Sequence, residues 1–395
     1  MGPNPSAPAD AATPKAKRRA IVLIPGMKRE ERFQRRDILA NNLETVERFP
    51  VSRIGEVLVE GEAGLRFRVD PLRVDPLRGE DAAASGGAGQ CLDVFEAYWA
   101  DMIPEQTELP PWSKLYKGLE LVGYWVFSLR TWQAVFSSLT KGSFLVAFGL
   151  LIGGATLVVW YLLLAVLVGQ TIAPGGSVPQ ELDLPVIGDA VAAFGSVTGW
   201  LASHAWWAVL PFLLTMLQVD AIVLLARFIK DYFENRADEQ GVGLRDRLRR
   251  RVGATLEAVL KADYDEVVLV AHSFGTVVAT DILADWPHRA DFKRLTYVSL
   301  GSPIGVLRFR SAWLEAERAE LLEADRLARW LDFFSPSDWL CGAVTGHRAR
   351  YGEAMSRRLT FEAPWPQRLS GRTHLEYYRD PRVLEFCIAP LPQGG

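Results

Sequence analysis

The chain has 395 residues, enough for one large α/β domain with an insertion or for two domains. Its formal net charge is −3, with 44 basic and 47 acidic side chains, so the charge balance argues against a nucleic-acid partner. The three cysteines, Cys91, Cys341 and Cys387, are widely spaced, which argues against a disulfide framework and a metal site and fits a reducing compartment.

The N-terminal segment, residues 1–18, is rich in Pro, Ala and Lys and predicts a disordered tail. Ala20–Ile24 is an apolar run that ends at Pro25-Gly26, which predicts a buried strand followed by a turn. Because this turn interrupts the run after five apolar residues, the basic cluster before it does not begin a signal peptide.

The next stretch alternates between helical and extended patterns. Residues 28–49 are charged and helix-prone, and the alternation in Val57–Val59 and Leu65–Val69 predicts a hairpin. Residues 70–90 are rich in Pro, Gly and Ala and predict a loop. Cys91–Ala100 follows, and its spacing of apolar residues predicts a helix.

Two apolar stretches then depart from the character of a soluble chain. Phe144–Val168 contains no charged residue and is long enough to cross roughly 30 Å of hydrocarbon as a helix. Trp200–Leu225 is apolar apart from His204 near its start and Asp220 near its end. The sequence therefore predicts a two-helix membrane insertion over residues 114–240, with spans at about 144–168 and 200–225.

The charges around these stretches are asymmetric. The connection from Gln170 to Ser203 contains no Lys or Arg. Basic residues flank the pair on both outer sides: Lys114, Lys117, Arg130, Lys141, Arg227, Lys230 and Arg236. The positive-inside rule then places both flanks in the cytoplasm, an arrangement suited to a bacterial inner membrane. Gly149 and Gly153 form a GxxxG pair, a pattern that lets helices approach closely, so a homo-oligomer through the membrane helices is one expectation.

The stretch Glu266–Thr276 reads as a buried strand, a tight turn carrying Ser273, and the start of a helix that runs to about Asp285. The residues two before and two after Ser273 are Ala271 and Gly275. Both are small, as a sharp bend from strand to helix requires. The bend lifts the hydroxyl above the sheet and places the next backbone amide at a helix N-terminus, where negative charge is stabilised.

This segment resembles the nucleophile elbow of α/β-hydrolases, with Ala271 in place of the usual first Gly. The resemblance implies a mostly parallel sheet with helices on both faces, formed by residues 19–113 and 241–395 and interrupted by the membrane insertion. It also implies an oxyanion site built from the amides of Met27 and Phe274, with Gly26 beside them.

The elements after the elbow extend the same pattern. Leu244–Lys261 predicts an amphipathic helix leading into the elbow strand. Later segments predict a strand with a turn at Leu295–Pro303, a charged helix at 312–329, a strand at Trp330–Phe334, a turn at Ser335–Asp338 and a terminal helix at Pro381–Cys387.

A serine nucleophile needs a base, and the chain contains five histidines. His204 belongs to a predicted span, His272 precedes Ser273 and should point away from it, and His288 closes the elbow helix. The resemblance implies the order Ser, acid, His, which favours His374 over His347 as the base. For the acid, Asp338 in the turn is favoured over Asp332 inside the strand.

These features predict a membrane-anchored serine hydrolase that cleaves carboxylic esters of lipids or other apolar acyl compounds, with Ser273, His374 and Asp338 as its triad and neither metal nor cofactor. Its expected partners are the lipid bilayer and the apolar substrate. Thioesterase, acyltransferase and amidase activities would use the same groups. A catalytically silent membrane scaffold or sensor with this fold is the alternative from another class.

Overall fold

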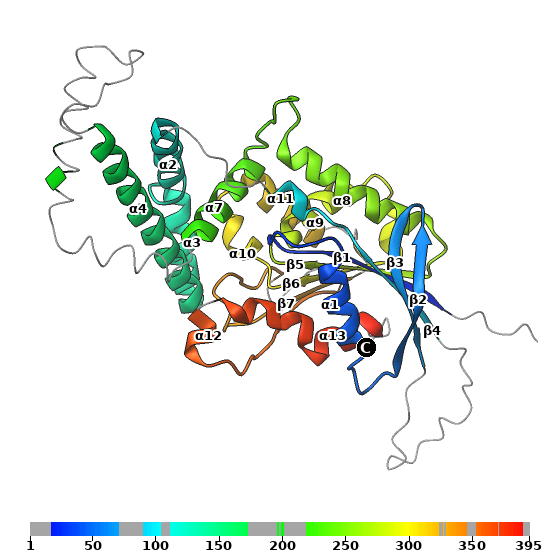
Figure 1. Ribbon diagram of the computed structural model, residues 1–395. Helices are drawn as coiled ribbons and strands as arrows, with labels where there is room; N and C mark the ends of the chain where they lie inside the picture. Colours follow the sequence, from blue (N-terminus) through cyan, green and yellow to red (C-terminus); the bar gives the residue numbers. More distant parts are fainter. Residues whose placement is uncertain are drawn as a thin grey trace, which may run out of the picture.

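A computed structural model describes residues 17–70, 90–103, 111–172, 196, 199–200, 219–323, 327, 329–345, 353–369 and 371–389. These residues form a mixed α/β fold around one eight-stranded sheet, ordered β2-β3-β4-β1-β5-β6-β7-β8 (Figure 1). The strands are β1 Arg18–Ile24, β2 Val51–Val59, β3 Glu62–Val69, β4 Gln90–Glu96, β5 Glu266–His272, β6 Leu295–Leu300, β7 Arg329–Phe334 and β8 Glu353–Arg358.

Strands β4, β1, β5, β6, β7 and β8 are parallel to one another, and β2 and β3 add an antiparallel hairpin at one edge. The parallel strands end at the same level. Ile24 of β1 pairs with Ala271 of β5, and His272 pairs with Leu300 of β6. Loops that follow these strands therefore meet along one edge of the sheet, where binding sites of parallel sheets lie.

Helices cover both faces of the sheet because its central strands bury side chains on both sides. In β5, Val267, Leu269 and Ala271 pack into one core, and Val268 and Val270 pack into the other. The first core is covered by α7, α8, α9, α10 and α11, and the second by α1, η6 and α13 (Figure 1). This two-sided burial explains why the strands read as apolar runs rather than as alternating patterns.

The helices have the following bounds: α1 Gln34–Leu43, η2 Ala100–Met102, α2 Pro111–Trp125, α3 Leu129–Thr140, α4 Phe144–Ile172, α7 Val219–Phe233, α8 Leu244–Lys261, α9 Gly275–Ala284, η5 Arg289–Lys293, α10 Ile304–Leu307, α11 Ala312–Glu323, α12 Trp365–Leu369, η6 Arg372–Arg379 and α13 Pro381–Ile388. The hairpin, the helix at Leu244–Lys261, the strands around residues 20–24, 267–271, 295–300 and 330–334, and the terminal helix are confirmed. The charged helix predicted over 312–329 ends earlier, at Glu323, and Arg329 already belongs to β7.

The helix predicted at Cys91–Ala100 is wrong, because most of this segment is strand β4. Asp93 and Glu96 of this segment resemble residues on the solvent face of an amphipathic helix, yet both side chains are buried. Asp93 accepts hydrogen bonds from Arg66 at 2.8 and 2.7 Å and from the Tyr264 hydroxyl at 2.7 Å. Glu96 is also buried, which raises its pKa to about 7. Pairing with β1 and β3 therefore decided the conformation of this segment.

One helix among the described residues is long and apolar enough to cross a membrane. Its apolar part, Phe144–Val166, has a mean hydropathy of 2.2, and only 28% of the apolar window is buried inside the structure. This helix, α4, packs against α2, α3 and α7 and lies with α2 and α3 to one side of the sheet (Figure 1). Most of the second predicted span falls in 201–218, outside the described residues, as do 1–16 of the predicted tail (1–18) and 71–89 of the predicted loop (70–90). Arg18 and Gln90, the last residues of that tail and loop, already belong to β1 and β4.

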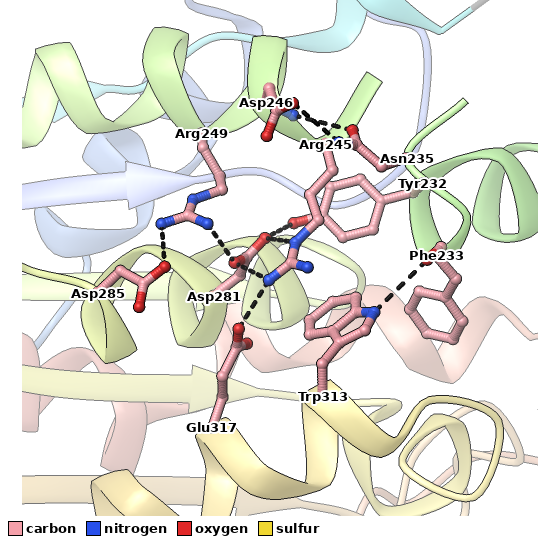
Figure 2. A network of polar contacts seen from close by, with 10 residues as sticks. All are labelled: Tyr232, Phe233, Asn235, Arg245, Asp246, Arg249, Asp281, Asp285, Trp313 and Glu317. Atoms are coloured by element: carbon pink, nitrogen blue, oxygen red, sulfur yellow. Dashed lines mark hydrogen bonds and ion pairs between the residues drawn. The ribbon is translucent and has the colours of Figure 1, made fainter. Parts of the chain in front are cut away.

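Helix α7 is tied to the elbow helix α9 by a buried polar network (Figure 2). The Tyr232 hydroxyl of α7 donates to Asp281 of α9 at 2.6 Å. Arg245 of α8 donates to both oxygens of Asp281, at 2.8 and 2.6 Å, and to Glu317 of α11 at 2.7 Å. Helices α7, α8 and α9 thereby meet at one fully buried carboxylate, and α11 joins them through Arg245.

Candidate active site

The residues that the sequence singled out lie along the edge where the parallel strands end. Gly26 follows β1, Ser273 follows β5, Asp338 lies beyond β7, and His374 lies in η6 beyond β8. Their grouping follows from the aligned ends of these strands, since each successive loop emerges beside the previous one.

Ser273 occupies a sharp turn between β5 and α9. Its backbone φ is 54°, a left-handed conformation that is uncommon for a residue with a side chain and is found mostly at functional or strained positions. The turn is held by the Ser273 amide, which donates to the Leu300 carbonyl at 2.9 Å, and by the Thr276 hydroxyl, which donates to the Ser273 carbonyl at 2.7 Å. The side chain is half-buried at the rim of the sheet.

Two glycines let the loop after β1 approach this turn. A Cβ at Gly275 would lie 2.5 Å from the Pro25 carbonyl oxygen, and a Cβ at Gly26 would lie 2.8 Å from Cβ of Ser273. The small residue at 275 is therefore required by the neighbouring loop as well as by the bend itself. The Trp99 indole anchors that loop by donating to the Pro25 carbonyl at 3.0 Å.

The two amides predicted for the oxyanion site, those of Met27 and Phe274, lie in segments next to Ser273. Neither the Met27 nor the Phe274 backbone N–H donates a backbone hydrogen bond within the described part of the chain. Phe274 directly precedes α9, so its amide belongs to the positive end of that helix. Gly26, which precedes Met27, lies against Ser273. Both amides therefore belong to segments beside the serine and are available to a ligand.

His374 and Asp338 are joined directly although 36 residues separate them in the chain. The Nδ1 atom of His374 donates to Oδ2 of Asp338 at 2.6 Å, and both side chains are buried. The carboxylate also accepts from the Leu340 amide at 3.0 Å and the Tyr377 hydroxyl at 3.1 Å. Burial acts to raise the pKa of Asp338, but His374 and the Leu340 amide hold the pKa below its usual value, so the acid stays ionised.

The other ring nitrogen of His374, Nε2, is buried and has no hydrogen-bond partner among the residues that the structure describes. No hydrogen bond joins it to the hydroxyl of Ser273 among the described residues. Both residues nevertheless border the end of β6: Ser273 through its bond to the Leu300 carbonyl, and His374 through its Cε1, which lies 3.2 Å from a Cβ placed on Gly301. Bonds between nucleophile and base are often long until a substrate is bound.

The competing candidates are placed elsewhere. Asp332 accepts hydrogen bonds from Ser299 at 2.9 Å and Ser356 at 2.8 Å, and its burial raises its pKa to about 6. His347 lies outside the described residues. The structure thus brings Asp338, and not Asp332, to the imidazole of His374.

His272 and Tyr377 support the site and were not identified from the sequence. The Nε2 of His272 donates to the backbone carbonyl of His374 at 2.7 Å, and the two rings lie 4.6 Å apart. Tyr377 accepts from the Ser335 amide at 3.0 Å while it donates to Asp338. Neither role has a local signal, because each depends on a partner from a different loop.

We expect His272 to make folding sensitive to acid. Burial, together with the adjacent His374, holds the pKa of His272 well below its ordinary value. Below about pH 6.5, His272 is protonated in the unfolded chain but stays neutral in the folded chain. The free energy of unfolding therefore falls as the pH drops, by up to about 1.4 kcal/mol per pH unit. Denaturant unfolding in detergent from pH 7 to 5 should show a shallower loss in His272→Gln, which keeps a donor but does not titrate.

The comparison with the variant is needed because other groups act in the opposite direction. The raised pKa values of Glu96, about 7, and Asp332, about 6, make the folded chain bind protons that the unfolded chain lacks. An identical pH slope in wild type and His272→Gln would show that His272 is not the acid-sensitive group.

Beside Ser273 lies an apolar cavity of about 180 Å³. Ser273 and Phe274 belong to its lining, and the rest of the lining comes from α2, α3, α4, α7, α10, Pro303 and the loop after Asp338. A candidate nucleophile thus faces a hydrocarbon-like space, a setting suited to apolar ligands.

No group of three or more His, Cys, Asp or Glu side chains suited to hold a metal occurs among the described residues. A scan against protein-family models gave no match to this chain, and searches of curated proteins and of solved structures gave no significant match.

Proposed function

We propose that this protein is a membrane-anchored serine hydrolase that cleaves carboxylic esters, with a fold related to that of the α/β-hydrolases. The observation that carries the proposal is the buried hydrogen bond between Asp338 and His374. This bond orients the imidazole, whose second nitrogen has no partner in the described part of the chain and lies at the same sheet edge as a serine on a left-handed turn. The chain order of these residues, serine, acid and histidine, is also that of the α/β-hydrolases.

The proposed reaction follows from these groups. The Ser273 hydroxyl attacks the ester carbonyl carbon while Nε2 of His374 takes its proton. The amides of Met27 and Phe274 hold the negative oxygen of the tetrahedral intermediate, and Asp338 stabilises the charged imidazole. The intermediate expels the alcohol, which receives the proton from His374. Water activated by the same imidazole then releases the acid and restores the serine.

Membrane anchoring is the second part of the proposal. It is supported by the exposed apolar surface of α4, where Phe144, Phe148, Leu151 and Ile152 are at least 38% exposed to solvent. A second span over about 200–225 would return the chain to the cytoplasm, so that both parts of the hydrolase domain lie on one side.

A single experiment tests both parts. In membranes from expressing cells, a fluorophosphonate probe should label a 43.9 kDa chain that stays in the pellet after an alkaline carbonate wash. Labelling should disappear in Ser273→Ala. Labelling that persists in this variant would remove Ser273 from its role, and a labelled chain released into the wash would rule out the membrane anchor.

One observation favours a catalytically silent scaffold: no hydrogen bond joins Ser273 to His374 among the described residues. A scaffold would neither react with the probe nor hydrolyse p-nitrophenyl esters. Thioesterase, acyltransferase and amidase activities require the same groups and would be separated by assaying the corresponding substrates.

A further inference from the structure

The apolar cavity beside Ser273 has one wall formed by the membrane-spanning candidate α4. Gly149, Leu150, Gly153, Gly154 and Leu157 of this helix line it. The facing wall comes from α7, through Ile222, Leu225, Ala226 and Ile229. None of the described residues that line it is charged, so the space favours hydrocarbon over a charged group.

The glycines of α4 open this space. Gly149, Gly153 and Leu157 are spaced by four residues and so share one face of the helix. This face points toward the active site, because a Cβ at Gly149 would overlap the indole ring of Trp339, the residue next to Asp338. A Cβ at Gly153 would meet no atom within 4 Å, so the position borders open space.

The volume and depth suit an alkyl chain. A cavity of about 150 Å³ can hold a molecule as large as benzene, and this one is about 180 Å³. The positions from Gly149 to Leu157 lie roughly 8 to 20 Å along α4 from its start at Phe144, at about 1.5 Å per residue. In a membrane-spanning α4 this depth lies around the middle of the roughly 30 Å of bilayer hydrocarbon.

The described lining contains few polar side-chain atoms. Besides the Ser273 hydroxyl, the lining residues Thr131 and Trp339 each carry a buried polar atom, Oγ1 and Nε1, without a hydrogen-bond partner. The rest of the lining has no side-chain group that would hold a headgroup.

We propose that the cavity between α4 and α7 is the acyl-chain site of a long-chain ester, and that Gly153 sets the length of chain it accepts. This rests on the proposed function, since it needs Ser273 as the nucleophile. The scissile carbonyl would lie at Ser273 and the alkyl chain would run along α4 at the level of the bilayer. The substrate class is therefore esters of unbranched fatty acids, and a volume of about 180 Å³ would hold the part of the chain nearest the carbonyl group.

The test uses the full-length protein in detergent and p-nitrophenyl esters with acyl chains of two to sixteen carbons. Gly153→Phe should lower kcat/KM for the long esters by about tenfold to a hundredfold, the range for a change in an apolar pocket, and leave the two-carbon ester unchanged. Ala155→Phe is the matched control, because Ala155 is exposed on the outer side of the same helix. It should keep the wild-type profile.

A second variant acts in the opposite direction and covers the case in which Gly153→Phe fails to fold. Leu157→Ala enlarges the cavity and should move the optimum toward longer acyl chains. An unchanged profile in Leu157→Ala, or equal effects of Gly153→Phe and Ala155→Phe, would overturn the acyl-site proposal. If the fluorophosphonate probe does not label the wild type, that result would instead overturn the proposed hydrolase function.

Discussion

Asp338→Asn is expected to lower kcat for ester hydrolysis by about 10⁴-fold with little change in the fold, as when a triad carboxylate is replaced by its amide. The carboxylate accepts the Nδ1 proton of His374 at 2.6 Å and so fixes the tautomer whose Nε2 can act as a base. An amide can present its N–H to Nδ1, which would then accept and leave the proton on the wrong nitrogen. Steady-state kinetics with a short ester would measure the loss, and circular dichroism would verify the fold.

Two controls separate this role from general damage. Glu376→Gln removes a carboxylate two residues from His374 that pairs only with Arg379 at 3.3 Å, and it should keep the wild-type rate. Asp332→Asn alters the acid that the structure places with Ser299 and Ser356, so it should reduce stability more than rate. Full activity in Asp338→Asn would show that Asp338 does not orient the base.

Asp281→Ala is expected to lower the free energy of unfolding by about 3–5 kcal/mol, the effect of breaking a buried ion pair by removing one partner. Figure 2 shows why: the carboxylate is the common acceptor for Tyr232 and Arg245. Without it, a fully buried hydroxyl loses its acceptor and Arg245 keeps only Glu317. Denaturant unfolding in detergent would measure the change.

Asp285→Ala is the matched control for this network. Asp285 lies at the end of the same helix and pairs with Arg249, but its side chain is 61% exposed. An exposed pair of this kind contributes about 0–1 kcal/mol, so this variant should unfold almost as the wild type does. Equal stabilities of the two variants would mean that the buried carboxylate does not hold α7, α8, α9 and α11 together.

The strands of the parallel sheet could be predicted because their information is local. In runs such as Ala20–Ile24 and Val267–Ala271, successive apolar side chains point to opposite faces of a strand, so all of them are buried only in a sheet covered on both faces. The elbow was equally readable, since Ser273 stands between small residues at the junction of a strand and a helix. Cys91–Ala100 was misread because Asp93 and Glu96 resemble exposed positions until Arg66 and Tyr264 are known to reach Asp93.

The sequence by itself determined where the central strands lie along the chain, which turn carries Ser273 and where the long apolar helix α4 begins. All of these features depend on residues that are neighbours in the chain. Only the tertiary structure decided that Asp338 rather than Asp332 meets His374, that His272 and Tyr377 support them, and that Gly149 of α4 packs on Trp339. Each of those facts depends on where the ends of different strands and helices meet in space. These contacts depend on how the whole chain packs, so the local sequence pattern does not predict them.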